Sequence, residues 1–144
     1  QQDLYLPSTI SETMGRVVIA VDTSGSIWGE TLNRFISEVS SLMQNVNPEL
    51  VDLIYWDSEV ASHEVYGLNE ADKMTQSTKP KGGGGTSPSC ITRYMKKNNI
   101  DPVCAIILTD GYVCSWGSGW TCPTLWGITS KGITSEVGKS VYVN

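Results

Sequence analysis

The sequence predicts an α/β domain: a three-layer sandwich whose mainly parallel central sheet has one antiparallel edge strand and helices on both faces. Apolar runs of strand length recur along the chain, and segments with helical periodicity lie between them. The chain has 144 residues, which is enough for one substantial core and too few for two ordinary domains. Its composition, with 40% hydrophobic and 17% charged residues, excludes a disordered chain.

The first half of the chain contains two predicted buried strands and the longest predicted helix. Residues 16–21 (RVVIAV) form a continuous apolar run, which is typical of a strand covered on both faces. Apolar side chains then recur at steps of three and four over 27–46, and this helix should end before Pro48, because the residue before proline avoids helical geometry. A second buried strand is predicted over 51–56, and the weakly alternating segment 59–67 predicts a more exposed edge strand.

The second half begins with a glycine-rich loop, KPKGGGGTSPS, over 79–89. A helix is predicted from this loop to about Lys97, and a third buried strand, VCAIIL, follows over 103–108. Two further strands are predicted over 123–128 and 138–143.

The domain organisation is expected to be simple. Residues 1–14 are polar and irregular and predict a lead-in segment, and one domain is expected over 15–144. The first residue is Gln, so we expect the chain to be part of a longer polypeptide. A net charge of −5 argues against nucleic acid and anionic membranes as partners, and no run approaches the ~20 apolar residues of a membrane span. A chain with this much apolar strand does not need a disulfide framework for its four cysteines, which favours a reducing, cytoplasmic location.

Oxygen-bearing side chains follow two of the predicted buried strands. Asp22, Ser24 and Ser26 stand in DTSGS after the first strand, and Asp110 follows the third. Ligand sites in open parallel sheets lie beyond the carboxyl ends of strands, where strand order reverses, so we expect both acids to face one crevice. The glycine-rich loop should deliver Thr86 to the same edge. Carboxylate and hydroxyl oxygens suit a hard dication such as Mg²⁺ or Mn²⁺.

These five positions resemble the metal-ion-dependent adhesion site of a von Willebrand factor type A (VWA) domain. The runs DLYLPS, VVIAVDTSGSI, VDLIYWD and LTDGY are also similar to the VWA-like C-terminal domain of a bacterial and phage family whose longer members carry a metallopeptidase-like domain upstream. The resemblance implies a VWA/Rossmann-like fold and a C-terminal position in the polypeptide. It also implies that Ser24, Ser26 and Thr86 ligate the metal through hydroxyls, while Asp22 and Asp110 act largely through bridging waters.

The function implied by this resemblance is non-enzymatic. The metal would keep an open position and accept an Asp or Glu carboxylate from a protein partner, and related domains often work beside AAA+ ATPases of the MoxR type. We also expect Gly85, Ser87, Asp57 and Trp116 to line the rim around the metal. Ser87 could take the place of the adjacent Thr86, Asp57 also suits a turn, and Trp116 stands in a Gly/Ser-rich loop whose exposure the sequence leaves open.

Three other interpretations remain beside this one. A Mg²⁺-dependent, dehalogenase-like phosphoryl transfer would use Asp22 as nucleophile, but such enzymes generally need a second Asp two residues later, where this chain has Ser24. The chain could serve as the accessory domain of a metallopeptidase whose catalytic part lies elsewhere, because His63-Glu64 has no second His to complete HExxH. The DTSGS cluster could also be a helix cap without metal. A nucleotide-binding P-loop is excluded because Gly85, not Lys, precedes Thr86.

Overall fold

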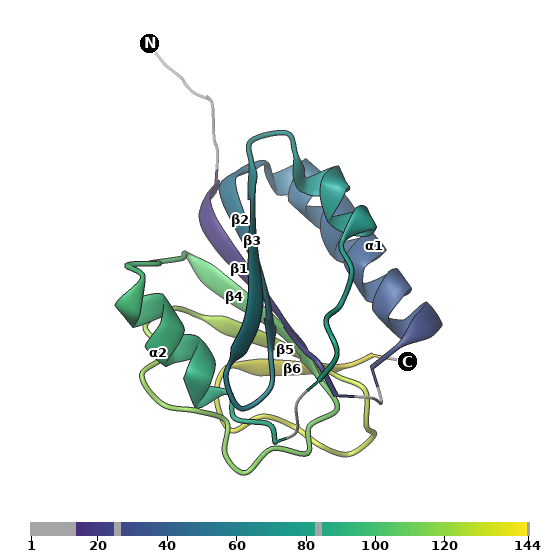
Figure 1. The fold of residues 1–144 in the computed structure, drawn as a ribbon, viewed down its shortest axis with the longest axis vertical. Coiled ribbons are helices and arrows are strands. Elements are labelled where there is room, and N and C mark those ends of the chain that lie inside the picture. Colours follow the sequence, from purple (N-terminus) through teal and green to yellow (C-terminus); the bar gives the residue numbers. More distant parts are fainter. Residues whose placement is uncertain (1–13, 25–26, 83–84, 144) are drawn as a thin grey trace.

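A six-stranded sheet forms the centre of the fold (Figure 1). The computed structural model describes residues 14–24, 27–82 and 85–143, so the predicted lead-in lies outside the described residues apart from Met14, where the first strand begins. In chain order the elements are β1 (Met14–Asp22), α1 (Gly29–Val46), β2 (Pro48–Trp56), β3 (Val60–Gly67), the 3₁₀ helix η1 (Ala71–Gln76), α2 (Ser89–Lys97), β4 (Cys104–Thr109), β5 (Thr124–Ile128) and β6 (Lys139–Tyr142). Within these ranges, no helix combines the length and apolar character that crossing a membrane requires.

The strand order in the sheet is β3-β2-β1-β4-β5-β6. All neighbouring pairs are parallel except β2 and β3, which are antiparallel at one edge. The predicted mainly parallel sheet with one antiparallel edge strand is therefore confirmed. β1 lies between β2 and β4, so the strand order reverses at β1, and the carboxyl ends of β1 and β4 flank this switch point.

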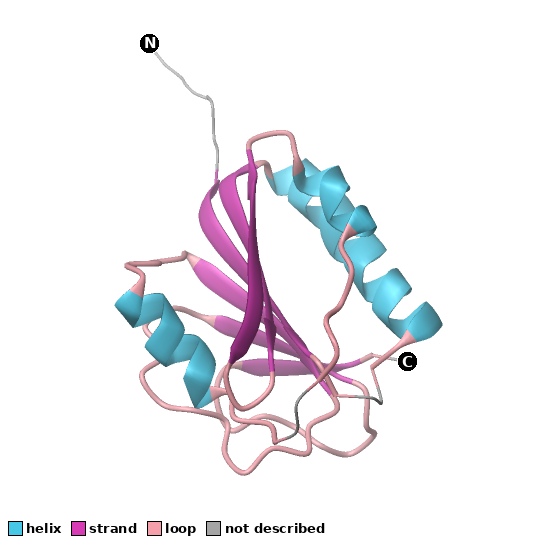
Figure 2. Ribbon diagram, in the orientation of Figure 1, coloured by secondary structure: helices cyan, strands magenta, loops and turns pink. Residues whose placement is uncertain are grey.

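Helices cover both faces of the sheet (Figure 2). Successive side chains of β1 point to opposite faces, as the pleat of a strand requires. Val17, Ile19 and Val21 pack in the core that contains the buried face of α1, whereas Val18 and Ala20 pack in the core that contains the buried face of α2. This two-sided burial explains why the sequence of β1 is continuously apolar.

The ends of α1 follow from local chemistry. The helix begins at Gly29, two residues after the predicted start, because Trp28 has an extended backbone with φ −140° and ψ 170°. It ends at Val46: the N–H of the capping residue Asn47 still donates to the carbonyl of Met43 at 2.8 Å, and the left-handed φ of Asn47, 52°, turns the chain out of the helix. The predicted end of the helix before Pro48 is confirmed.

The long connection between β4 and β5 contains no helix and completes the core on the α2 side of the sheet. Trp116 and Trp120 stand edge-on to the fully buried Trp126, with ring centroids 5.1 and 5.6 Å away. Periodicity could not assign this Gly/Ser/Trp-rich segment because its order depends on these contacts with β5.

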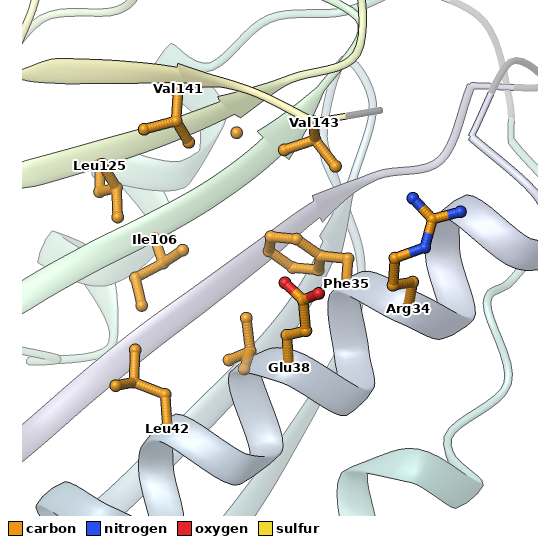
Figure 3. A pocket seen from close by; sticks show the side chains of 10 residues that line it. Arg34, Phe35, Glu38, Leu42, Ile106, Leu125, Val141 and Val143 are labelled. Atoms are coloured by element: carbon orange, nitrogen blue, oxygen red, sulfur yellow. The ribbon is translucent and has the colours of Figure 1, made fainter.

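An apolar groove of about 260 Å³ lies between α1 and the strands β4, β5 and β6 (Figure 3). Phe35 and Leu42 of α1 form one wall, and Ile106, Leu125 and Val141 form the other. Helix α1 therefore covers the first strands of the sheet more completely than the last ones.

Candidate metal centre

The two predicted acids come to the same edge of the sheet, at the switch point. Asp22 is the last residue of β1, and Asp110 follows the last residue of β4. Val21 pairs with Leu108 in the parallel register, so the two strands end nearly level (Figure 1). Burial is the main cause of the raised pKa of Asp22, and the negative charge of Asp110 acts in the same direction. The expectation that these carboxylates share one edge agrees with this register.

Asp22 is a fully buried carboxylate. Its Oδ1 accepts a hydrogen bond from the backbone N–H of Ser24 at 2.9 Å, and its Oδ2 accepts one from the hydroxyl of Thr109 at 2.8 Å. Burial raises the pKa of Asp22 above its usual value, while these two hydrogen bonds and the charge of Lys79 act in the opposite direction. A second carboxylate nearby makes the region more negative, which is the electrostatic setting that a bound cation would relieve.

The turn after β4 holds Asp110 in place. Its Oδ1 accepts a hydrogen bond from the backbone N–H of Tyr112 at 2.9 Å, as in an Asx turn. Gly111 between them has a φ of +89°, and its N–H donates to the Thr109 hydroxyl at 3.2 Å. Thr109 therefore links this turn to Asp22, because it also donates to that carboxylate.

The predicted hydroxyl ligands come from two loops. Ser24 is half-buried directly after β1, and Ser26 lies outside the described residues. Thr86 is half-buried in the loop before α2, and its carbonyl accepts a weak hydrogen bond from the Cys114 thiol at 3.6 Å. Gly85 beside it has a φ of +75°, a left-handed conformation that glycine adopts without strain.

The predicted rim residues divide into two groups. Ser87 and Asp57 are in direct contact, because the Ser87 N–H donates to the Asp57 carbonyl at 2.9 Å. Asp57 also forms a turn, accepting the N–H of Glu59 on its Oδ1 at 3.0 Å. Trp116 is half-buried against Trp126 on the α2 side of the sheet, and its role at the rim stays a prediction.

Three further residues contribute to this region in ways that the sequence motifs do not reveal. Thr109 bonds Asp22, Lys79 donates to the carbonyls of Ser24 and Ile27, and the hydroxyl of Thr23 is buried with no hydrogen-bond partner among the described residues. Thr109 is the last residue of β4 and Lys79 stands 55 positions after Ser24, so no local pattern predicts that either of them contacts the end of β1 or the residues after it. Only proximity in the fold identifies them.

The donor set at this edge is mainly oxygen, which suits a hard dication, although the Cys114 thiol also lies beside Thr86. Within the described ranges, no group of three or more His, Cys, Asp or Glu side chains is arranged to hold a metal. The nearby groups are instead two carboxylates and several hydroxyls, including the unpartnered one of Thr23. Mg²⁺ and Mn²⁺ accept such oxygen ligands and complete their shell with water.

His63 lies on the edge strand β3, in a separate network that links this strand to β2, β1 and α2. Its Nε2 contacts Asp52 at 2.7 Å, its Nδ1 contacts the Tyr94 hydroxyl at 2.8 Å, and Asp52 also accepts two hydrogen bonds from Arg16. These bonds to Asp52 raise the pKa of Arg16 above its usual value. His63 is thus a strand histidine with hydrogen-bond partners on both ring nitrogens.

Comparisons with known proteins agree with this architecture. The model of the VWA-like domain (DUF2201) family matches residues 17–143. The fold is similar to that of the ArnB paralog VWA2 from Sulfolobus acidocaldarius, with a TM-score of 0.50 and 17% sequence identity over 81% of this chain. That alignment spans 36% of the VWA2 chain, about a third of its length. No curated protein sequence matches this chain. VWA-like domains are typically protein-interaction modules, and this chain belongs to the VWA-like domain (DUF2201) family.

Proposed function

We propose that this domain is a non-enzymatic, metal-dependent protein-binding module. In this proposal Ser24, Ser26 and Thr86 hold Mg²⁺ or Mn²⁺ through their hydroxyls, and Asp22 and Asp110 act through bridging waters. The metal keeps one position open, where it takes an Asp or Glu carboxylate from a partner protein.

The observation that carries the proposal is the buried Asp22 at the switch point of the sheet. Burial and the nearby Asp110 make the charged form of Asp22 costly, and the charge of Lys79 offsets only part of this cost, because the pKa of Asp22 remains raised. A dication would lower that cost directly. Neutral hydroxyls as its nearest ligands leave most of its positive charge available, so it would attract an external carboxylate strongly.

Partner identity follows only by analogy. Related domains work beside MoxR-type AAA+ ATPases, and we propose such an ATPase as the first partner to test. An accessory role beside a metallopeptidase domain of the same polypeptide is the second candidate, supported by the similarity of this chain to the VWA-like part of that family.

The dehalogenase-like phosphatase is less well supported. Asp22 would have to act as a nucleophile, yet both its oxygens accept hydrogen bonds and its side chain is fully buried. The general acid that such enzymes need would stand at position 24, which is a serine.

The direct test is a Mg²⁺ titration of the purified domain by calorimetry and thermal unfolding. A ligand at about 100 times its Kd stabilises the folded state by about 2.7 kcal/mol, which raises the Tm by several degrees. Asp22→Asn and Ser24→Ala should remove this stabilisation while leaving the circular dichroism spectrum unchanged. Asp101→Asn is the matched control, because Asp101 is an exposed acid at the opposite end of β4.

Two further measurements separate the candidate functions. Capture of a partner that depends on Mg²⁺ and is lost both with EDTA and in Ser24→Ala supports the binding module. Phosphate release from a generic phosphomonoester that is lost in Asp22→Asn would support the phosphatase instead. Unchanged Mg²⁺ affinity in both site variants would refute the proposed metal site.

A further inference from the structure

Lys79 is a buried lysine whose ammonium is enclosed by the loop that follows β1. Lys79 is only 5% exposed, although Lys is among the residue types least often buried. The Nζ donates to the carbonyl of Ser24 at 2.8 Å and to the carbonyl of Ile27. It also lies 4.1 Å from the centroid of the Trp28 ring, within the range of a cation–π interaction. All three contacts belong to one short loop.

Removing this ammonium from water costs free energy, so other contacts must offset the lost hydration. Loss of solvent lowers the pKa of Lys79, and the negative charge of Asp22 acts in the opposite direction. The two carbonyl oxygens replace water as acceptors, and the face of Trp28 supplies a third favourable contact. Among the described residues, Ser24, Ile27 and Trp28, which follow β1, thus compensate this charge.

The glycine-rich loop meets the loop after β1 at a second point, three residues after Lys79. A Cβ atom at Gly82 would lie 2.6 Å from the carbonyl oxygen of Thr23, so only glycine fits there. The two loops that supply the proposed hydroxyl ligands Ser24 and Thr86 are therefore held together by the Lys79 hydrogen bonds and by this close approach.

We propose that Lys79 is a positioning residue for the metal site. Its ammonium holds the carbonyls of Ser24 and Ile27, and so it fixes the backbone at Ser24, close to Asp22, before any metal arrives. The ammonium is not a ligand. This inference rests on the proposed function, but the holding of the loop by Lys79 can be measured without metal.

Two opposing effects make the test decisive. If positioning dominates, loss of the ammonium weakens Mg²⁺ binding, because the metal must then order the loop itself. If charge repulsion between the ammonium and the dication dominates, loss of the ammonium strengthens binding. The sign of the change in affinity distinguishes these effects.

The experiment compares Lys79→Met with Lys81→Met, which removes an exposed lysine two residues later in the same loop. In metal-free protein, hydrogen exchange of a peptide that covers the loop after β1 should be at least tenfold faster in Lys79→Met and unchanged in Lys81→Met. The Mg²⁺ affinity by calorimetry should fall at least tenfold in Lys79→Met alone. Lys79→Arg keeps the charge and the donors, so its exchange rate and its Mg²⁺ affinity should lie between those of wild type and Lys79→Met. This variant serves as the test if Lys79→Met does not fold.

Unchanged exchange in the Lys79 variants, or a Mg²⁺ affinity equal to or above that of wild type, would overturn the role of Lys79. These outcomes leave the proposed function standing, provided that wild type binds Mg²⁺ and Asp22→Asn does not. A wild-type protein that binds no Mg²⁺ would overturn the proposed function itself, and with it the assignment of Lys79 to a metal site.

Discussion

Replacing Gly111 by alanine tests the turn that carries Asp110. Gly111 has a φ of +89°, and a Cβ atom there would lie 2.8 Å from Cγ2 of Ile133 and 3.0 Å from Cγ2 of Ile128. Both contacts are with β-branched side chains, whose methyl groups stand close to the backbone and rotate little. The alanine must therefore displace either the turn or the chain that packs on it.

The magnitude follows from three contributions. A left-handed backbone costs a non-glycine residue about 1–2 kcal/mol, and overpacking a core costs about 1–3 kcal/mol. The lower entropy of the unfolded alanine chain returns about 0.4–1 kcal/mol. The sum predicts that Gly111→Ala lowers the free energy of unfolding by about 3 kcal/mol.

Gly132→Ala is the matched control. Gly132 has a similar φ of +80°, but a Cβ atom there meets no heavy atom within 4 Å. This variant should lose only the backbone contribution, about 1 kcal/mol after the entropy gain. Urea denaturation of the metal-free proteins measures both values, and a difference of about 2 kcal/mol corresponds to a Tm that is roughly 4–8 °C lower for Gly111→Ala. Equal stability of the two variants would refute the steric argument.

Three further predictions concern buried polar and aromatic groups. Burial raises the folded-state pKa of Asp22, so the stability that its protonated form contributes is lost as pH rises through that pKa. The metal-free Asp22→Asn variant should therefore gain stability relative to wild type as pH rises. Urea denaturation across a pH series measures this gain, and its absence would contradict the prediction. Asp52→Asn should lower the free energy of unfolding by about 1.5–3 kcal/mol, because the Arg16 guanidinium loses its charged partner, and an unchanged urea midpoint would contradict this. Trp126→Ala should cost about 3–5 kcal/mol by the same assay, whereas Tyr112→Ala, at a side chain that is 71% exposed, should stay within about 0.5 kcal/mol of wild type.

Much of the fold could be predicted because burial leaves a local record in the sequence. β1 and β4 are covered on both faces, so their sequences are continuously apolar, and α1 shows the three- and four-residue spacing of a helix with one buried side. The asparagine before Pro48 ended α1 where the geometry of proline requires it. The antiparallel edge strand β3 has a weaker alternation of apolar and polar residues, because its side chains are only partly buried.

The candidate site was predictable in part for a similar reason. Parallel strands end at one edge, so acids that follow two buried strands of such a sheet are expected together, and Asp22 and Asp110 follow this rule. Trp116 could not be assigned, because its exposure depends on its packing against Trp126, which lies in another strand.

By itself, the sequence determined the order of the elements, the parallel sheet and the acids and hydroxyls at the ends of its strands. Those features depend on neighbours along the chain, and residue spacing encodes them. Only the tertiary structure decided which distant groups meet: the hydroxyl of Thr109 at Asp22, Ile133 against Gly111, and the ammonium of Lys79 enclosed by carbonyls 52 and 55 positions earlier. Such contacts depend on strand register and on the path of each loop, and neither leaves a periodic trace in the sequence.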